Sequence, residues 1–216
     1  PIRWRFRAMQ LGFDLGADPM AKIEPAFKSV LDFEKSINAW MGLQKGAAQL
    51  FAHPIETPVG TMVAICDATH LHLLEFADRK ELPKELCKLG TVLGAIAPGQ
   101  TQITRALHKQ ISGYFEGTLQ QFDIPLALHG TDFTKDVWRA LLQLPHGTTT
   151  SYGALSISLG NPTATRAVAR ANGANQIAIL IPCHRVIGKS GKLTGYAGGL
   201  DRKRALLAIE GLAVSP

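Results

Sequence analysis

Apolar residues recur at helical spacing through the first 45 positions of the chain. Residues 20–27 and 29–41 each carry apolar side chains three and four positions apart, and Ser29 is a candidate N-cap for the second stretch. The pattern therefore predicts a helical N-terminal segment over residues 1–45.

From about Leu50 the periodicity changes to that of β-strands. Residues 61–66 and 70–76 are rich in apolar side chains, and the polar turn between them predicts a β-hairpin. Helices are expected over 81–93 and 102–115, and a short strand over 122–126, which Pro125 places at an edge of the sheet. Strands and helices together predict an α/β subdomain over residues 50–127.

Beyond Gly130 the pattern is helical again, which predicts a second subdomain over residues 128–212. Two of its short helices, joined by a glycine-containing turn, have the shape of a helix-turn-helix, whose second helix enters a groove of DNA. The expected elements are a core helix over 133–142 capped by Thr131 or Thr134, short helices over 152–159 and 164–172, a Gly-rich loop over 188–199 and a last helix over 203–209.

Positive charge is concentrated near the C-terminal end of the chain. The formal net charge is +6, and between residues 161 and 211 eight basic side chains stand against two acidic ones. A localised basic surface is the footprint of a polyanionic partner, with nucleic acid the leading case, and a solvated basic face is the alternative. The basic side chains are Arg166, Arg170, Arg185, Lys189, Lys192, Arg202, Lys203 and Arg204.

Neither a membrane span nor a metal site is apparent. No apolar run approaches the roughly 20 residues of a transmembrane helix, and the start of the chain does not resemble a signal peptide. The cysteines are scattered, and no Cys-x-x-Cys pair suggests zinc. Cys66 and Cys87 lie in apolar patterns without a neighbouring base, so we expect both to be packing residues. His70 and His72 lie on one face of an expected strand without further ligands, which favours exposed histidines. We therefore expect no metal, no cofactor, no membrane partner and a reducing, cytoplasmic location.

The stretch Ile181-Pro182-Cys183-His184-Arg185-Val186 places a thiol beside a base and a cation. The thiolate is the nucleophilic form of cysteine, and neighbouring cationic or basic groups lower the pKa of a thiol. Cys183 is therefore a candidate nucleophile. A buried cysteine that packs as a small hydrophobe is the alternative, and the local composition does not decide between them.

The second short helix of the expected helix-turn-helix is slim and basic. Its alanines leave little side-chain bulk, while Arg166 and Arg170, four positions apart, project from one face. The minor groove of DNA is only about 6 Å wide, so a slim helix with projecting arginines suits it. An ion pair with a neighbouring element is the alternative for Arg170.

The segment around Cys183, the expected helix-turn-helix before it and the Gly-rich loop after it resemble, in residue order and spacing, those of the O6-alkylguanine-DNA alkyltransferases. The resemblance covers about residues 50–212. The Pro-Cys-His-Arg-Val core is a fairly specific signature. Residues 1–45 resemble a degenerate AraC-type helix-turn-helix, with an ordinary helical leader as the alternative, so the chain is similar to the C-terminal part of an Ada-type bifunctional protein. The matching positions are Asp132 to Thr134, Val137, Trp138, Ser151, Tyr152, Asn161, Pro162, Arg166 to Val168, Asn175, Ile179 to Val186, Gly195, Tyr196, Gly198 to Leu200, Glu210 and Gly211.

The resemblance implies an α/β (α+β) fold, with an RNase H-like sheet subdomain followed by a helical helix-turn-helix subdomain. It implies single-turnover transfer of the alkyl group from O6-alkylguanine in duplex DNA to Cys183, after the base is flipped out from the minor groove. O4-methylthymine is a further candidate substrate, and we expect a monomer. The implied site comprises Cys183, His184, Glu210 and Asn175 for catalysis, Tyr152, Arg166, Ala167, Arg170 and Arg185 for DNA binding, and Tyr152, Val186, Tyr196 and Ala197 for the base pocket.

Two positions depart from what we expect in the family. Arg170 stands in place of a small residue, and Asn172 in place of an apolar or sulfur-containing one, which can alter the groove fit or the range of alkyl groups. Two other functions are alternatives: a non-enzymatic binder of alkylated bases, whose known forms lack the acceptor cysteine, and a transcription regulator with a vestigial alkyltransferase half. The presence of Cys183 opposes the first, and the intact set of Cys183, His184 and Glu210 opposes the second.

Overall fold

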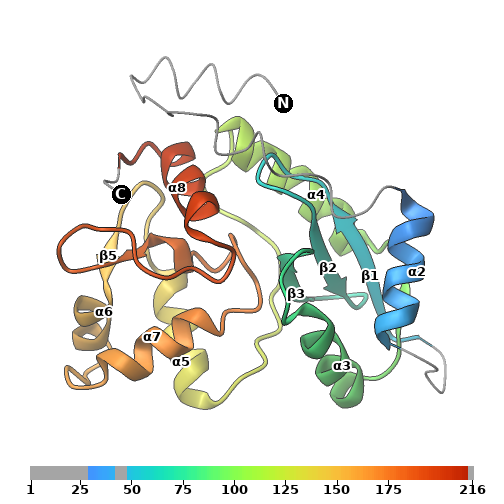
Figure 1. Cartoon of the computed structure of the whole chain (residues 1–216), viewed down its shortest axis with the longest axis horizontal. Helices are drawn as coiled ribbons and strands as arrows, with labels where there is room; N and C mark the ends of the chain where they lie inside the picture. The colour runs from blue at the N-terminus through green and yellow to red at the C-terminus, as the bar shows by residue number, and fades with distance from the viewer. Residues whose placement is uncertain (1–28, 42–47, 214–216) are drawn as a thin grey trace. The chain divides into compact units, whose positions relative to one another are not determined.

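The computed structural model of the 216-residue chain describes residues 29–41 and 48–213 (Figure 1). The chain divides into two compact units. The described part of the sheet unit comprises 29–41, 48–113 and 122–127, and the described part of the helical unit comprises 114–121 and 128–213. The helices predicted within residues 1–28 lie outside the described residues.

The sheet unit is built on a four-stranded sheet with the strand order β3-β2-β1-β4. β2 pairs antiparallel with both β1 and β3, and β4 pairs parallel with β1. The predicted hairpin is confirmed as β2 and β3, but β4 was not predicted, because three residues are too few to show a period. The strands are β1 (Leu50–Ile55), β2 (Met62–Cys66), β3 (Leu71–Phe76) and β4 (Ile96–Pro98).

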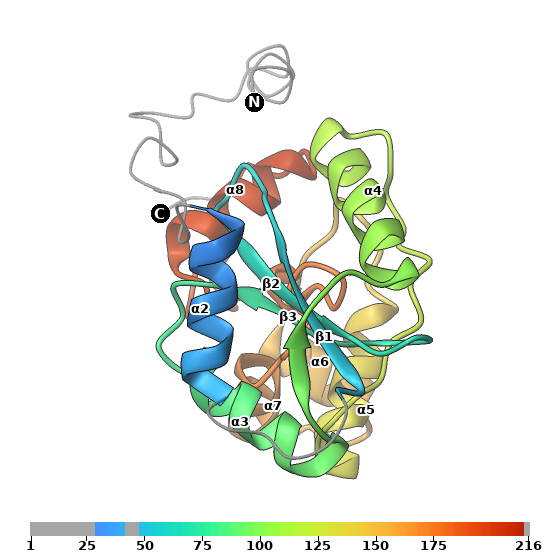
Figure 2. The ribbon, with the colours of Figure 1, turned by 90° about the vertical axis from the view of Figure 1, so that its right-hand side faces the viewer.

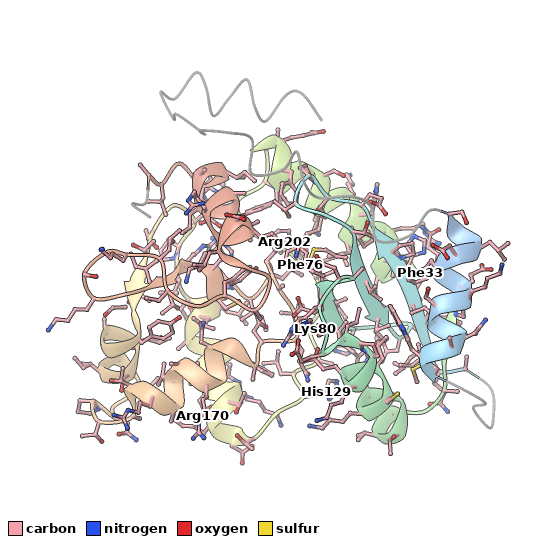
Figure 3. The ribbon with its side chains drawn as sticks, in the orientation of Figure 1. Phe33, Phe76, Lys80, His129, Arg170 and Arg202 are labelled. Carbon is pink, nitrogen blue, oxygen red and sulfur yellow. The ribbon has the colours of Figure 1, made fainter. Side chains whose placement is uncertain are left out.

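Helix α2 (Val30–Met41) belongs to this unit. As predicted, Ser29 caps it, and its Oγ accepts a hydrogen bond from the Asp32 amide at 3.1 Å. Helix α2 lies beside the sheet and α3 (Leu82–Leu93) in Figure 2, and Phe33 and Ile37 are buried in one core with residues of both. Phe33 points toward the sheet (Figure 3). The expectation of a separate helical segment ending near residue 45 is thus corrected, because the apolar face of α2 is buried against the sheet.

Helix α4 (Gln102–Glu116) crosses the division between the units, so that Tyr114 belongs to the helical unit. The predicted edge strand near Pro125 is reduced to a single bridge between Leu126 and Leu71. The Leu71 amide donates to the Pro125 carbonyl oxygen at 2.9 Å, so the segment does follow the edge of β3.

Two expectations about the sheet unit are wrong. His72 is buried, not exposed, and its Nε2 lies 2.9 Å from Oδ2 of Asp67 in the turn before β3. Cys87 is exposed, not packed, and its thiol donates to the Trp40 carbonyl oxygen at 3.1 Å. In both cases the side chain makes a polar contact that the local periodic pattern does not reveal.

In the helical unit, side-chain caps stabilise the starts of two helices, and one buried indole joins two helices to each other. Thr131 Oγ1 accepts from the Thr134 amide, and Ser151 Oγ accepts from the Ala154 amide, which caps the helices that begin at Asp132 and Tyr152. Trp138 Nε1 donates to the Ala171 carbonyl oxygen at 2.8 Å and ties α5 to α7. The elements are α5 (Asp132–Leu142), β5 (Thr150–Ser151), α6 (Tyr152–Ser158), α7 (Thr165–Gly173), the 3₁₀ turn η1 (Cys183–Arg185), β6 (Val186–Ile187) and α8 (Leu200–Ile209).

Within residues 29–41 and 48–213, no helix combines the length and the apolar character needed to cross a membrane. The same residues contain no group of three or more His, Cys, Asp or Glu side chains arranged to hold a metal ion.

Candidate active site

The buried segment that leads to Cys183 is fixed by the side chain of Asn175. The Asn175 Oδ1 accepts from the Ile177 amide at 3.0 Å, and its Nδ2 donates to the Ile181 carbonyl oxygen at 2.9 Å. Ile179 between them has φ of 72°, a strained value for a β-branched residue. One amide thus spans a backbone bend that the chain would otherwise avoid.

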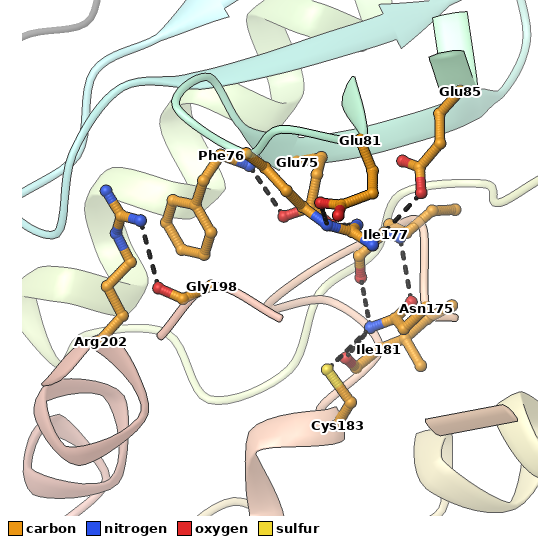
Figure 4. Close-up of polar contacts among 11 residues, drawn as sticks. Glu75, Phe76, Glu81, Glu85, Asn175, Ile177, Ile181, Cys183, Gly198 and Arg202 are labelled. Carbon is orange, nitrogen blue, oxygen red and sulfur yellow. Dashed lines mark hydrogen bonds and ion pairs between the residues drawn. The ribbon is translucent and has the colours of Figure 1, made fainter. Parts of the chain in front are cut away.

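The same Asn175 amide reaches the sulfur of Cys183. Nδ2 lies 3.1 Å from Sγ, and Figure 4 shows the amide aimed at the thiol. A hydrogen bond to sulfur stabilises the thiolate more than the thiol, because the negative charge strengthens the acceptor. Cys183 itself is 5% exposed. Its sulfur is therefore held in a defined position at the start of η1, near the surface but not on it.

Glu210 follows α8 and is a hydrogen-bond hub. His184 Nε2 and Arg185 Nη2 donate to its Oε1 at 2.8 and 2.9 Å, and Arg185 Nε donates to its Oε2 at 2.8 Å. The Gly147 amide adds a donor to Oε2 at 3.2 Å, and the Tyr114 hydroxyl adds one to Oε1 at 2.9 Å. Burial alone raises the pKa of Glu210, but the hydrogen bonds from His184 and Arg185 and the charge of Arg185 outweigh burial and hold that pKa well below its usual range.

An ionised Glu210 fixes the tautomer of His184. The carboxylate only accepts hydrogen bonds, so His184 Nε2 must carry the proton that it donates. Burial lowers the pKa of His184, and the opposing effect of Glu210 does not fully offset it, so the ring is neutral near pH 7. Nδ1 is then a buried acceptor, and it has no hydrogen-bond partner among the described residues. The ring next to Cys183 can therefore take up a proton at Nδ1.

Comparisons with known proteins agree with this geometry. Residues 132–212 match the family described as "6-O-methylguanine DNA methyltransferase, DNA binding domain". The methylated-DNA–protein-cysteine methyltransferase of Methanosarcina barkeri is 43% identical over 159 residues, which are 72% of this chain and 94% of that protein. The chain belongs to the methylated-DNA–protein-cysteine methyltransferase family.

Mycobacterial members of the methylated-DNA–protein-cysteine methyltransferase family are also similar to the chain. The Mycobacterium tuberculosis H37Rv protein of that name is 59% identical over 101 residues, and this alignment spans 47% of the chain and 61% of the relative. The crystal structure of M. tuberculosis OGT in complex with DNA matches with a TM-score of 0.66 at 42% identity, covering 74% of this chain and 93% of that one.

The structure corrects the expectation for Arg185. It was expected to contact DNA, but its side chain is buried. Its guanidinium binds both carboxylate oxygens of Glu210, and Nη1 donates to the Leu144 carbonyl oxygen at 2.6 Å. Arg185 therefore binds the carboxylate, and its three guanidinium nitrogens all donate to oxygens within the protein.

Lys203 is a second basic residue that does not lie on the surface. It is fully buried, and its Nζ donates to the carbonyl oxygens of Val186 and Thr194 at 2.6 and 2.7 Å and of Gly195 at 3.5 Å. Burial lowers its pKa to about 8. The neighbouring Arg202 also binds the chain, donating to the Gly198 carbonyl oxygen at 3.2 Å. The basic side chains between residues 161 and 211 were expected to form a surface for a polyanionic partner, but Arg202 and Lys203 bind backbone oxygens of the Gly-rich loop.

The other candidates for DNA binding lie on α7. Arg166 and Arg170 are exposed, and Arg170 projects from the helix in Figure 3, while Ala167 between them is partly buried. At the far end of α7, Asn172 is buried and its Nδ2 lies 3.5 Å from the Cys183 carbonyl oxygen. The helix that presents the arginines is therefore also the helix that contacts the cysteine segment.

The base-pocket candidates come from three places in the helical unit. β5 pairs with β6, so that Ser151 lies opposite Ile187 and the start of α6, at Tyr152, is drawn toward the residues after Cys183. Val186 is buried, Tyr152 and Tyr196 are partly buried, and Ala197 is exposed. Burial raises the pKa of Tyr152, which keeps its hydroxyl protonated near neutral pH.

Sequence analysis missed Tyr114 as a residue of this site. Tyr114 continues the apolar stripe of α4 with Leu107 and Ile111, and all three are buried. A buried tyrosine hydroxyl normally needs a hydrogen-bond partner, so a tyrosine within an apolar stripe is a signal that polar chemistry lies opposite. Here the partner is Glu210.

Proposed function

We propose that the protein repairs O6-alkylguanine in duplex DNA by transferring the alkyl group to Cys183 in a single turnover. The observation that carries this proposal is a cysteine whose sulfur is bound by Asn175 and which is followed directly by His184, itself hydrogen-bonded to the buried Glu210. A cysteine, a neutral imidazole and an ionised carboxylate form the arrangement that activates a nucleophile. The names of the relatives point to the same reaction.

In the proposed step, the thiol proton of Cys183 passes through a water molecule to Nδ1 of His184. The thiolate then attacks the alkyl carbon, so that a sulfur–carbon bond forms as the bond between that carbon and O6 breaks. The electron pair of the broken bond stays with the base, which takes up a proton and becomes guanine. Glu210 stabilises the imidazolium through Nε2, and the thioether product is stable, so each molecule acts once.

The DNA is held, in this proposal, by the helix-turn-helix formed by α6 and α7 through the minor groove. The exposed Arg166 and Arg170 and the partly buried Ala167 on α7 support this interpretation. The target nucleotide is rotated out of the duplex at a cost of a few kcal/mol. Arg166 occupies the vacated position in the stack, while Tyr152, Val186, Tyr196 and Ala197 receive the base.

Mass spectrometry after incubation with a duplex that contains O6-methylguanine tests the transfer. We expect the peptide that contains Cys183 to gain the mass of one methyl group, once per molecule. Cys87→Ser is the matched control, because Cys87 is the exposed thiol of this chain and its loss should leave the yield unchanged. Full binding of the methylated duplex with an unmodified Cys183 overturns the transferase in favour of a non-enzymatic binder.

The base-flipping role of Arg166 has its own test. Arg166→Ala should slow methyl transfer from the duplex much more than transfer from the free base O6-methylguanine, because only the duplex requires extrusion. Equal losses on both substrates would remove Arg166 from this role.

Several other properties stay predictions. They are the repair of O4-methylthymine, the monomeric state, the cytoplasmic location, the RNase H-like description and an Ada-type arrangement around this segment.

A further inference from the structure

Tyr114 shares one carboxylate oxygen with His184. Its hydroxyl donates to Oε1 of Glu210 at 2.9 Å, and His184 Nε2 donates to the same oxygen at 2.8 Å. Tyr114 is 0% exposed, and its ring packs edge-to-face against Phe115 and His146 at centroid distances of 5.3 and 6.2 Å. The hydroxyl is therefore held on this oxygen by rings on two sides.

We propose that Tyr114 is a positioning residue that sets the basicity of His184 through Glu210, and this inference rests on the proposed function. A carboxylate oxygen that already accepts from Tyr114 is a weaker acceptor for the imidazole. With Tyr114 in place, His184 is easier to keep neutral, and only the neutral ring can take the proton of Cys183. Tyr114 thus acts one residue away from the reacting atoms.

The protonation state of Tyr114 supports a constant role as donor. Burial raises the pKa of Tyr114 well above its ordinary value, and the neighbouring charge of Glu210 raises it further. The phenol therefore keeps its proton at neutral and moderately alkaline pH. The titratable and charged groups around this contact come from four parts of the helical unit. They are Lys203 on α8 and Glu210 directly after it, His184 and Arg185 on η1, Tyr196 in the Gly-rich loop and His146 before β5.

The direction of the effect follows from the shared oxygen. In Tyr114→Phe, Oε1 loses one donor while His184 and Arg185 keep theirs, so the carboxylate binds the imidazolium more strongly and the pKa of His184 rises. The lower inflection of the transfer rate against pH should then move up by about one pH unit. Below that inflection the rate should fall about tenfold, and above it the two proteins should react equally fast.

The experiment measures the rate of methyl transfer from a duplex containing O6-methylguanine across pH, for the unaltered chain, Tyr114→Phe and Phe115→Leu. Phe115→Leu is the matched control, because it disturbs the packing beside Tyr114 and leaves the hydroxyl in place. It should leave the inflection where it is, even if thermal unfolding shows a loss of stability. An unchanged profile in Tyr114→Phe, or a uniform loss at every pH, overturns the proposal.

A second measurement does not depend on the transfer reaction. A ¹⁵N NMR titration of His184 should show its pKa raised in Tyr114→Phe, and this rise should vanish when Glu210→Gln is present in both proteins. A rise that persists with Glu210→Gln would mean that Tyr114 does not act through the carboxylate. If the unaltered chain transfers no methyl group, the proposed function fails, and the titration still decides the role of Tyr114.

Discussion

Glu210 in the helical unit and Glu75 in the sheet unit are both buried carboxylates beside an arginine. Their pKa values nevertheless shift in opposite directions from the ordinary value of a glutamate. Glu210 accepts hydrogen bonds from five donors on four residues. Glu75 accepts from the Phe76 amide at 2.9 Å and from Arg79 at 2.5 Å (Figure 4). Burial raises the pKa of Glu75 to about 7 despite these partners, whereas the pKa of Glu210 lies well below its usual range.

The arginines explain the difference. Arg185 serves Glu210 alone among carboxylates in the described part of the chain, whereas Arg79 also lies 3.3 Å from Glu85 and 3.6 Å from Glu81. One cation shared among three carboxylates cannot neutralise them all. Burial removes water from an ionised carboxylate, and hydrogen-bond donors and cations must make up for the lost hydration free energy. The buried acid with more donors and a cation of its own therefore stays ionised.

Loss of Arg185 should have the largest effect. Arg185→Leu leaves Glu210 buried without its cation, and we expect the free energy of unfolding to fall by about 3–5 kcal/mol, with loss of methyl transfer. Urea unfolding measures the first effect, and mass spectrometry the second. Arg170→Ala, at an exposed arginine, should leave stability unchanged. A loss below about 1 kcal/mol in Arg185→Leu would show that Glu210 does not need the cation.

Loss of Arg79 should cost less, because Glu75 can take up a proton. For Arg79→Leu we expect a fall of about 1–3 kcal/mol in the free energy of unfolding at neutral pH. The fall should shrink when the pH is lowered to about 5, since protonation then removes the repulsion among the carboxylates. Denaturation at both pH values checks this, with the exposed Lys84→Ala as the control. A loss that grows with acidity would contradict the shared-cation explanation.

Replacement of Glu75 itself should change stability little at neutral pH but alter its pH dependence. Between the ordinary value of 4.5 and about 7, the folded chain binds more protons at Glu75 than the unfolded chain, so this residue makes stability fall as pH rises. Glu75→Gln should remove that fall and stay within about 1 kcal/mol of the unaltered chain near neutrality. Glu210 behaves in the opposite way, because its pKa is lowered on folding. It stabilises the folded chain at pH values above the ordinary pKa of a glutamate, and this stabilisation is lost as the pH falls. An unaltered slope in Glu75→Gln would place its pKa near the ordinary value.

The smallest effect is expected where a carboxylate and an arginine meet in solvent. Asp136 and Arg139 lie 2.8 Å apart, and both side chains are more than half exposed. Asp136→Ala should change the free energy of unfolding by less than about 0.5 kcal/mol, because water screens the pair. A loss comparable to that of Arg79→Leu would show that burial is not what distinguishes the three pairs.

What the sequence predicted correctly is local. The caps at Ser29 and Thr131 and the hairpin β2–β3 depend on residues only a few positions apart, and the structure has each of them. Cys183 and His184 were found together because they adjoin in the chain. Such features can be predicted because their free energy comes from contacts within one or two turns of backbone.

What the sequence could not predict depends on burial and on distant partners. A basic residue has the same charge whether it faces DNA or a carboxylate, so Arg185 and Lys203 were counted as surface residues although both are buried. Tyr114 and Glu210 are 96 positions apart, and no periodic pattern connects them. The two-residue strands β5 and β6 are too short to show alternation, yet their pairing brings Tyr152 toward the cysteine segment.

The binding of Lys203 to backbone oxygens has a consequence for variation. Its ammonium binds carbonyls of Val186, Thr194 and Gly195 and touches none of their side chains through these bonds. A loop anchored by main-chain atoms keeps its anchor whatever side chains it carries. Evolution or laboratory selection can therefore exchange the side chains of this loop while the backbone contacts beneath it stay the same.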